Sequence, residues 1–164
     1  MRKSFAFLCA ACFGITAGLF CGNSFAVTTV TDCTMEPCFL KGQRVLVSCQ
    51  PETDDILQRG EVVLFENHFY HETGENSMMM KRIIGLPGEE IRLDCGSVYV
   101  DGELLNDNWT DIYRKGTASM DAKVVPAGNY FVLGDNRRES TDSRDETVGM
   151  VRKDEIIGKV IRQW

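Results

Sequence analysis

Residues 80–88 read MKRIIGLPG, an apolar run that carries Lys81 near its start and ends in a Gly/Pro turn. A short apolar run bounded by a turn is typical of a buried strand. Burial disfavours the ammonium form of lysine, and a neutral amine can act as a general base near neutral pH. At the ordinary lysine pKa of about 10.4, about 1 side chain in 2,500 is neutral at pH 7; a pKa of about 8 raises that share to about a tenth. The stretch predicts a strand carrying a candidate base, unless the lysine points into water, as most lysines do.

Short strands separated by turn signals are predicted on both sides of this stretch, and after residue 26 no long amphipathic helix is evident. Two stretches are expected to be loops, residues 67–77 and 105–123. The chain is therefore predicted to be all-β. The candidate strands are 27–31, 44–48, 61–66, 78–84, 90–93, 97–100, 130–133 and 158–163.

Three further segments accompany the lysine stretch: TMEP at 34–37, RGEVV at 59–63 and GDNRRESTDSR at 134–144. In this order the four segments resemble the type I signal peptidases, which are membrane-anchored serine proteases with a Ser/Lys dyad. The resemblance extends from about residue 27 to residue 164. It implies a signal peptidase/LexA-like β fold and a catalytic domain over residues 27–164, in a compact form without the inserted domain of larger members.

The resemblance also implies the catalytic residues. It places the nucleophile at Thr34, where the family has a serine, and the general base at Lys81. Ser140 would hydrogen-bond the lysine amine and orient it, while Asp142 and Arg144 would pair to hold their loop. Thr34 also has a plainer role open to it, as a turn residue whose side chain caps the next backbone N–H.

Two departures from the family pattern bear on activity. Threonine adds a β-methyl group that restricts χ1 and crowds the approach to a carbonyl. Two residues earlier, Asp32 stands where some members have a serine that helps to stabilise the oxyanion. A carboxylate there would repel the developing charge. Either Asp32 turns away, or the backbone N–H of Thr34 stabilises the oxyanion largely alone. The thiols of Cys33 and Cys38 are lesser candidates for the nucleophile.

Three methionines are candidate substrate-binding residues. The resemblance places Met35 near a substrate cleft, and Met79 and Met80 form part of a flexible apolar strand suited to a peptide groove. Packing in the core is an equal alternative for Met35, and a purely structural place in the strand is an equal alternative for Met79 and Met80. Arg82 alternates to the opposite strand face and is expected to be structural, and residues 134–136 are expected to shape a turn.

Residues 1–26 are predicted to be a membrane anchor or a signal segment. Met1-Arg2-Lys3 precedes an uncharged run from residue 5 to residue 22, which indicates a cytoplasmic N-terminus. Ser24-Phe25-Ala26 has the small-x-small pattern of a cleavage site. We expect a single-pass protein of the cytoplasmic (inner) membrane with its catalytic domain on the periplasmic or extracellular side. Cleavage after Ala26 would instead release it to the periplasm.

Composition limits the other partners. The net charge of −6 argues against nucleic acid as a partner. His68 and His71 lack a ligand-like spacing, so no metal and no other cofactor is predicted. Four cysteines follow residues 1–26, and an even number in an oxidising compartment suggests two disulfides. All three pairings stay open, with Cys33–Cys38 and Cys49–Cys95 slightly favoured.

The resemblance implies an endopeptidase that removes signal peptides from exported preproteins at the cytoplasmic membrane. Two alternatives stay open. One is a conjugative-transfer peptidase of the same family that matures a pilin. The other is a non-catalytic pseudoprotease that binds signal-peptide-like segments, which Thr34 and Asp32 would favour. The leader and the acidic balance disfavour a third, a self-cleaving repressor. The oligomeric state is not predicted.

Overall fold

The computed structural model describes residues 25–49, 57–67, 77–106, 109 and 119–164. This part of the chain is all-β, as predicted: it contains strands and one short 3-10 helix, η1 (Lys153–Glu155). The strands are β1 (Phe25–Thr29), β2 (Arg44–Ser48), β3 (Val62–Asn67), β4 (Ser77–Gly85), β5 (Glu90–Asp94), β6 (Ser97–Val100), β7 (Glu103–Leu104), β8 (Met120–Val124), β9 (Asn129–Leu133), β10 (Val151–Arg152) and β11 (Ile156–Gln163).

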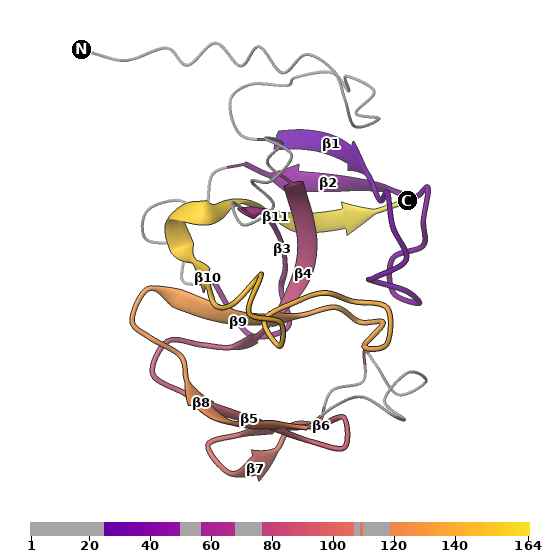
Figure 1. Ribbon diagram of the computed structural model, residues 1–164. Coiled ribbons are helices and arrows are strands. Elements are labelled where there is room, and N and C mark those ends of the chain that lie inside the picture. Colours follow the sequence, from indigo (N-terminus) through magenta and orange to yellow (C-terminus); the bar gives the residue numbers. More distant parts are fainter. Residues whose placement is uncertain (1–24, 50–56, 68–76, 107–108, 110–118) are drawn as a thin grey trace, which may run out of the picture.

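The strands form two antiparallel sheets. The larger has seven strands in the order β1-β2-β11-β3-β4-β9-β10, and the smaller has four in the order β7-β6-β5-β8. Figure 1 shows β1 and β2 at one end of the molecule and the smaller sheet at the other. The lysine stretch joins the two sheets, because β4 belongs to the larger sheet and runs through the turn at residues 86–88 into β5 of the smaller one.

A hydrophobic cluster fastens the loop between β1 and β2 to the larger sheet. Val30, Met35 and Phe39 of this loop are buried, and they pack with Val45 and Val47 of β2. Fully burying one such side chain stabilises by roughly 1.5–3 kcal/mol. Thr34 lies between these buried residues, so packing on both sides of it fixes its place over the sheet. Two further clusters fill the rest of the core, one between β3, β4 and β9 and one between the two sheets.

All eight predicted strands are present, with ends that differ by up to two residues. The prediction of a loop over residues 105–123 was wrong at its end, where β8 pairs with β5. Most of β8 is exposed and backbone pairing holds it in place, so its sequence lacks the apolar alternation on which the prediction depended. The short strands β7 and β10 were missed as well. Residues 68–76 of the other expected loop lie outside the described residues.

The predicted N-terminal anchor or leader lies almost entirely outside the described residues, which begin at Phe25. Phe25 and Ala26 are the first residues of β1 and pair with Ser48 and Val47. Within the part of the chain that is described, no helix has the length and apolar character needed to cross a membrane.

The prediction of two disulfides was wrong. Cys33, Cys38, Cys49 and Cys95 are all free. Cys49 directly follows β2 in the larger sheet, whereas Cys95 lies in the β5–β6 turn at the other end of the molecule (Figure 1). The Cys38 thiol donates a hydrogen bond to the backbone carbonyl of Trp109 at 3.6 Å instead of meeting Cys33. A disulfide requires Cα atoms within about 7 Å and Cβ atoms that point toward each other.

Candidate active site

Thr34 and Lys81 meet, although 47 positions separate them in the sequence. The Lys81 amine donates a hydrogen bond to the Thr34 hydroxyl oxygen, with 2.8 Å between Nζ and Oγ1. Thr34 comes from the loop between β1 and β2, and Lys81 from the middle of β4, opposite Val63 of β3. The Lys81 side chain is 1% exposed, so it does not point into water.

Burial lowers the pKa of Lys81 below its ordinary value, because removal from water penalises the ammonium form. The carboxylates of Asp32, Asp142 and Asp135 act in the opposite direction, and the guanidinium of Arg144 acts with the burial. Desolvation is the largest of these influences and sets the direction. A buried amine with a lowered pKa, in contact with a hydroxyl, has the properties that a general base requires.

Asp32 does not turn away from Thr34. Its Oδ1 atom accepts two hydrogen bonds, one from the Thr34 backbone N–H at 2.9 Å and one from the Thr34 hydroxyl at 2.7 Å. The hydroxyl therefore accepts from Lys81 and donates to Asp32. The carboxylate also binds the backbone donor that an oxyanion would need.

The segment that begins at Gly134 lies against the Thr34 loop. The backbone N–H of Asn136 donates to the Thr34 carbonyl at 3.0 Å, and its side-chain amide donates to the Cys33 carbonyl at 3.2 Å. A Cβ atom on Gly134 would lie 2.6 Å from the Thr34 carbonyl oxygen, so only glycine fits at this distance from the loop. Sequence reasoning assigned these residues to a turn and missed both contacts.

A buried ion pair supports both sides of the site. Arg82 donates to Asp135 from two nitrogens, and the Nε–Oδ1 distance is 2.7 Å. Arg82 also donates to the Gly60 carbonyl and lies over the Trp109 ring, with 4.7 Å from its Cζ atom to the ring centroid. The pair links β4, beside Lys81, to the segment that carries Asn136. Arg82 thus has the structural position expected of it, and Asp135 makes an ion pair that the sequence did not indicate.

The other supporting residues lie next to this pair. Arg144 pairs with Asp142, with 2.7 Å between Nε and Oδ1, and also donates to the carbonyls of Arg137 and Ser140. Asp142 is fully buried and accepts from the Gly134 backbone N–H at 2.9 Å. Within the described residues, no hydrogen bond joins Ser140 to Lys81. The Ser140 hydroxyl instead lies against Gly134 and makes a long contact of 3.5 Å with the Thr141 carbonyl.

The predicted substrate-binding methionines lie deeper than expected. Met35 is fully buried in the core cluster beneath the Thr34 loop, which favours core packing, the alternative held open for it, over substrate binding. Met79 and Met80 are partly buried and pack against two different clusters. Met78, at 47% exposure, is the most accessible of the three methionines in β4.

The thiol of Cys38 does not have the character of a nucleophile. Burial raises its pKa to about 11, and the nearby Asp135 carboxylate acts in the same direction. The thiol therefore stays protonated at neutral pH, and a protonated thiol is a poor nucleophile.

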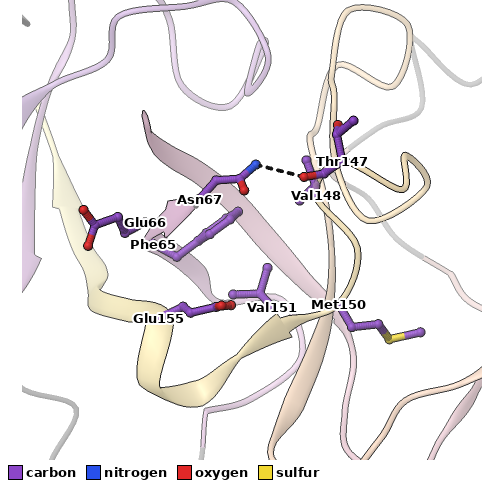
Figure 2. Close-up of a pocket in the computed structure, with 8 residues that line it drawn as sticks. All are labelled: Phe65, Glu66, Asn67, Thr147, Val148, Met150, Val151 and Glu155. Atoms are coloured by element: carbon purple, nitrogen blue, oxygen red, sulfur yellow. Dashed lines mark hydrogen bonds between the residues drawn. The ribbon is translucent and has the colours of Figure 1, made fainter. Parts of the chain in front are cut away.

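A separate pocket lies away from Thr34 and Lys81, between β3, residues 147–150, β10 and η1. In Figure 2 the Asn67 side chain points toward Thr147, whose backbone carbonyl it contacts at 3.4 Å. The residues that line this pocket include neither of the proposed catalytic pair. The described residues contain no group of three or more potential metal ligands. His68 and His71 lie outside them.

Comparison with known proteins gives concordant matches. Residues 2–164 match the family described as signal peptidase, peptidase S26. A signal peptidase IB of Staphylococcus aureus (strain COL) is 32% identical over 165 residues, which cover 89% of this chain and 82% of that protein. A signal peptidase I of Bacillus amyloliquefaciens is 31% identical over 142 residues, which cover 82% and 72%. The crystal structure of a signal peptidase I from Enterococcus faecalis V583 has a TM-score of 0.54 and 28% identity, over 65% of this chain and 97% of that one.

Proposed function

The chain belongs to the signal peptidases of peptidase family S26, and from this we propose that it is an endopeptidase that removes signal peptides from exported preproteins. Thr34 is the nucleophile and Lys81 the general base. One observation carries this assignment: the amine of a lysine that is 1% exposed, with a lowered pKa, lies 2.8 Å from the Thr34 hydroxyl.

The reaction begins with a change of hydrogen bonds at Thr34. The hydroxyl donates to Asp32 in the free protein, so it must turn and donate to the neutral Lys81 amine. Lys81 takes the proton as Oγ1 attacks the scissile carbonyl, and the new oxyanion replaces Asp32 at the Thr34 N–H. Lys81 then protonates the leaving amine. The neutral Lys81 amine next deprotonates a water molecule. This water hydrolyses the acyl-enzyme and restores Thr34.

An unpaired strand edge beside the site supports the binding of an extended substrate. β3 pairs with β4 from Ser77 onward. On the other side, β9 pairs with β4 only at Arg82, Ile83 and Gly85. In the part of the chain that is described, residues 77–81 therefore have one edge with no strand against it. A preprotein segment can add there as a strand, with its scissile bond near Lys81.

The proposed location is the cytoplasmic membrane. The short basic start at Arg2 and Lys3, followed by an uncharged run over residues 5–22, supports an anchor with a cytoplasmic N-terminus. The β domain then lies on the periplasmic or extracellular side, where exported preproteins emerge.

A second candidate function is a pseudoprotease that binds signal-peptide-like segments without cutting them. The observation that favours it is the contact between Asp32 and both reacting groups of Thr34. Substrate binding at the β4 edge needs neither of those groups. The two functions therefore differ in turnover and not in binding.

Cleavage of a preprotein with a small-x-small site tests the proposal. The full-length protein in detergent or lipid should cut the preprotein, and Lys81→Ala should lower the rate at least about 100-fold, since general base catalysis contributes about 10²–10⁴. Lys123→Ala, on the exposed strand β8, is the matched control and should cut normally. A parent protein that binds the preprotein without cutting it would reject the peptidase assignment. Gain of cleavage in Thr34→Ser would then identify a degraded site.

A further inference from the structure

We propose that Asn136 is a positioning residue whose side-chain amide fixes the direction in which the Thr34 N–H points. This role deepens the proposed peptidase function and holds only if that function does. Asn136 itself touches no reacting atom. It acts through the peptide unit that joins Cys33 to Thr34.

The Cys33 carbonyl and the Thr34 N–H are the two ends of that one planar peptide unit. Asn136 donates to the carbonyl end from its side chain, at 3.2 Å, and donates to the next carbonyl, that of Thr34, from its backbone, at 3.0 Å. Turning the Thr34 N–H requires rotation of the whole plane. Such a rotation would break the bond from the Asn136 side chain, and also the bond that the Cys33 carbonyl accepts from the Glu36 backbone N–H at 3.2 Å.

The direction of this N–H matters because oxyanion stabilisation requires a donor that is already aimed at the reacting oxygen. The Asp32 carboxylate shows where an acceptor can sit. Its Oδ1 atom is within hydrogen-bond distance of both the N–H and the attacking Oγ1. A negatively charged oxygen that forms beside Oγ1 can therefore reach the same donor once Asp32 leaves.

Loop stability alone does not account for an amide at position 136. The residue is only 6% exposed, and among the described residues its Oδ1 atom has no hydrogen-bond partner. An unpaired buried oxygen destabilises the fold, so the amide is better explained by what its donor does. The preceding residue, Asp135, is fixed by its buried ion pair with Arg82. This pair holds the backbone next to Asn136 in place.

Asn136→Ala and Asn136→Leu test the role in the full-length protein. Alanine deletes the donor, whereas leucine keeps nearly the same volume and shape, adds no charge and cannot donate. We expect kcat to fall about 10- to 100-fold in both variants. This fall is smaller than or similar to the one caused by deleting an oxyanion donor itself. KM should stay within about twofold of the parent value. Asn129→Ala is the matched control, because it removes a similar bond, from an asparagine amide to the Ala127 carbonyl, in an exposed turn. It should leave kcat unchanged.

A peptide aldehyde separates positioning from general damage. The Thr34 hydroxyl adds to its carbonyl, and the resulting tetrahedral oxygen takes the place of the oxyanion. The inhibition constant of the peptide aldehyde should rise in the Asn136 variants by the same factor as kcat/KM falls. The affinity for the product peptide, which ends in a carboxylate and forms no adduct, should stay within about twofold of the parent.

Three results would overturn the role: unchanged kcat in folded Asn136 variants, an equal loss of affinity for aldehyde and product, or the same loss in Asn129→Ala. Circular dichroism at the assay temperature establishes folding, and if Asn136→Ala unfolds, Asn136→Leu decides. A parent that cuts no preprotein refutes the peptidase function itself. An active parent with fully active Asn136 variants refutes only the positioning role.

Discussion

At the scale of single residues, the site depends on which group holds the Thr34 hydroxyl proton. In the free protein the proton points to Asp32, and Lys81 donates to the same oxygen. Burial keeps the lysine pKa low, whereas the Asp32 carboxylate raises it. In the proposed mechanism the same aspartate therefore opposes catalysis in two ways: it holds the hydroxyl and N–H of Thr34, and it favours the ammonium form of the proposed base.

Asp32→Ser should therefore increase activity. We expect kcat/KM to rise about tenfold, which corresponds to about 1.4 kcal/mol and lies close to the lower end of the range of about 1.5–3 kcal/mol for a hydrogen bond to a charged group. Preprotein cleavage at several substrate concentrations measures it. Asp121→Ser, on the exposed strand β8, serves as the control for the lost charge. A drop in kcat/KM would mean that Asp32 assists the reaction, for example as the acceptor of the hydroxyl proton.

Lys81→Met should stabilise the fold at neutral pH. The folded-state pKa of Lys81 is lowered, so between that pKa and the unfolded value of about 10.4 the unfolded chain binds a proton that the folded chain does not. The parent thus loses stability as pH falls through this window. The variant should gain on the order of 1–4 kcal/mol near pH 7, as when buried charged groups are replaced by apolar ones.

Urea unfolding at pH 7 and at pH 10 measures this gain. It should be smaller at pH 10, because the unfolded lysine is then partly neutral as well. A gain that stays constant with pH would show that Lys81 titrates like an exposed lysine.

At the scale of elements, the site is formed by three segments that are distant in sequence. They are the loop that carries Thr34, the strand β4 and residues 134–144. The strands were predictable because their apolar residues follow the pattern of buried strands, as in the stretch around Lys81. The strand β8 was not predictable, since four of its five residues are exposed and it is held mainly by backbone pairing to β5 and by Met120, which packs against the core. The contacts of Asp135 and Asn136 link residues up to 103 positions apart, and no local pattern encodes them.

Gly134→Ala should disrupt the contact between two of these segments. The added methyl group would lie 2.6 Å from the Thr34 carbonyl and would clash with Ser140, so the Thr34 loop must shift. A shift of about 1 Å can lower the rate roughly a hundredfold. Overpacking should also destabilise by about 1–3 kcal/mol.

The control for Gly134→Ala is Gly102→Ala. Its new Cβ would meet no atom within 4 Å, but the positive φ of +83° makes alanine unfavourable. This variant should lose stability and keep its activity. Comparing kcat/KM with the midpoint of thermal unfolding for both variants separates the two effects. Equal loss of activity in both would mean that Gly134 matters for stability alone.

At the scale of the whole molecule, the two sheets and their core account for the fold of the described residues without a covalent crosslink. The cysteine count suggested two disulfides, yet all four described thiols are free. Counting cannot place Cys49 and Cys95, which lie next to strands of different sheets. The all-β class was predictable from the short apolar runs between turn signals, and the proximity of Thr34 to Lys81 from the family motifs in their fixed order.

The chain enters the larger sheet at Phe25, nine positions before Thr34. Even a fully stretched run of that length reaches no more than about 32 Å. β1 and its loop therefore hold the proposed nucleophile within that distance of Phe25. A bilayer surface at Phe25 would restrict cutting to bonds that emerge close beside that surface.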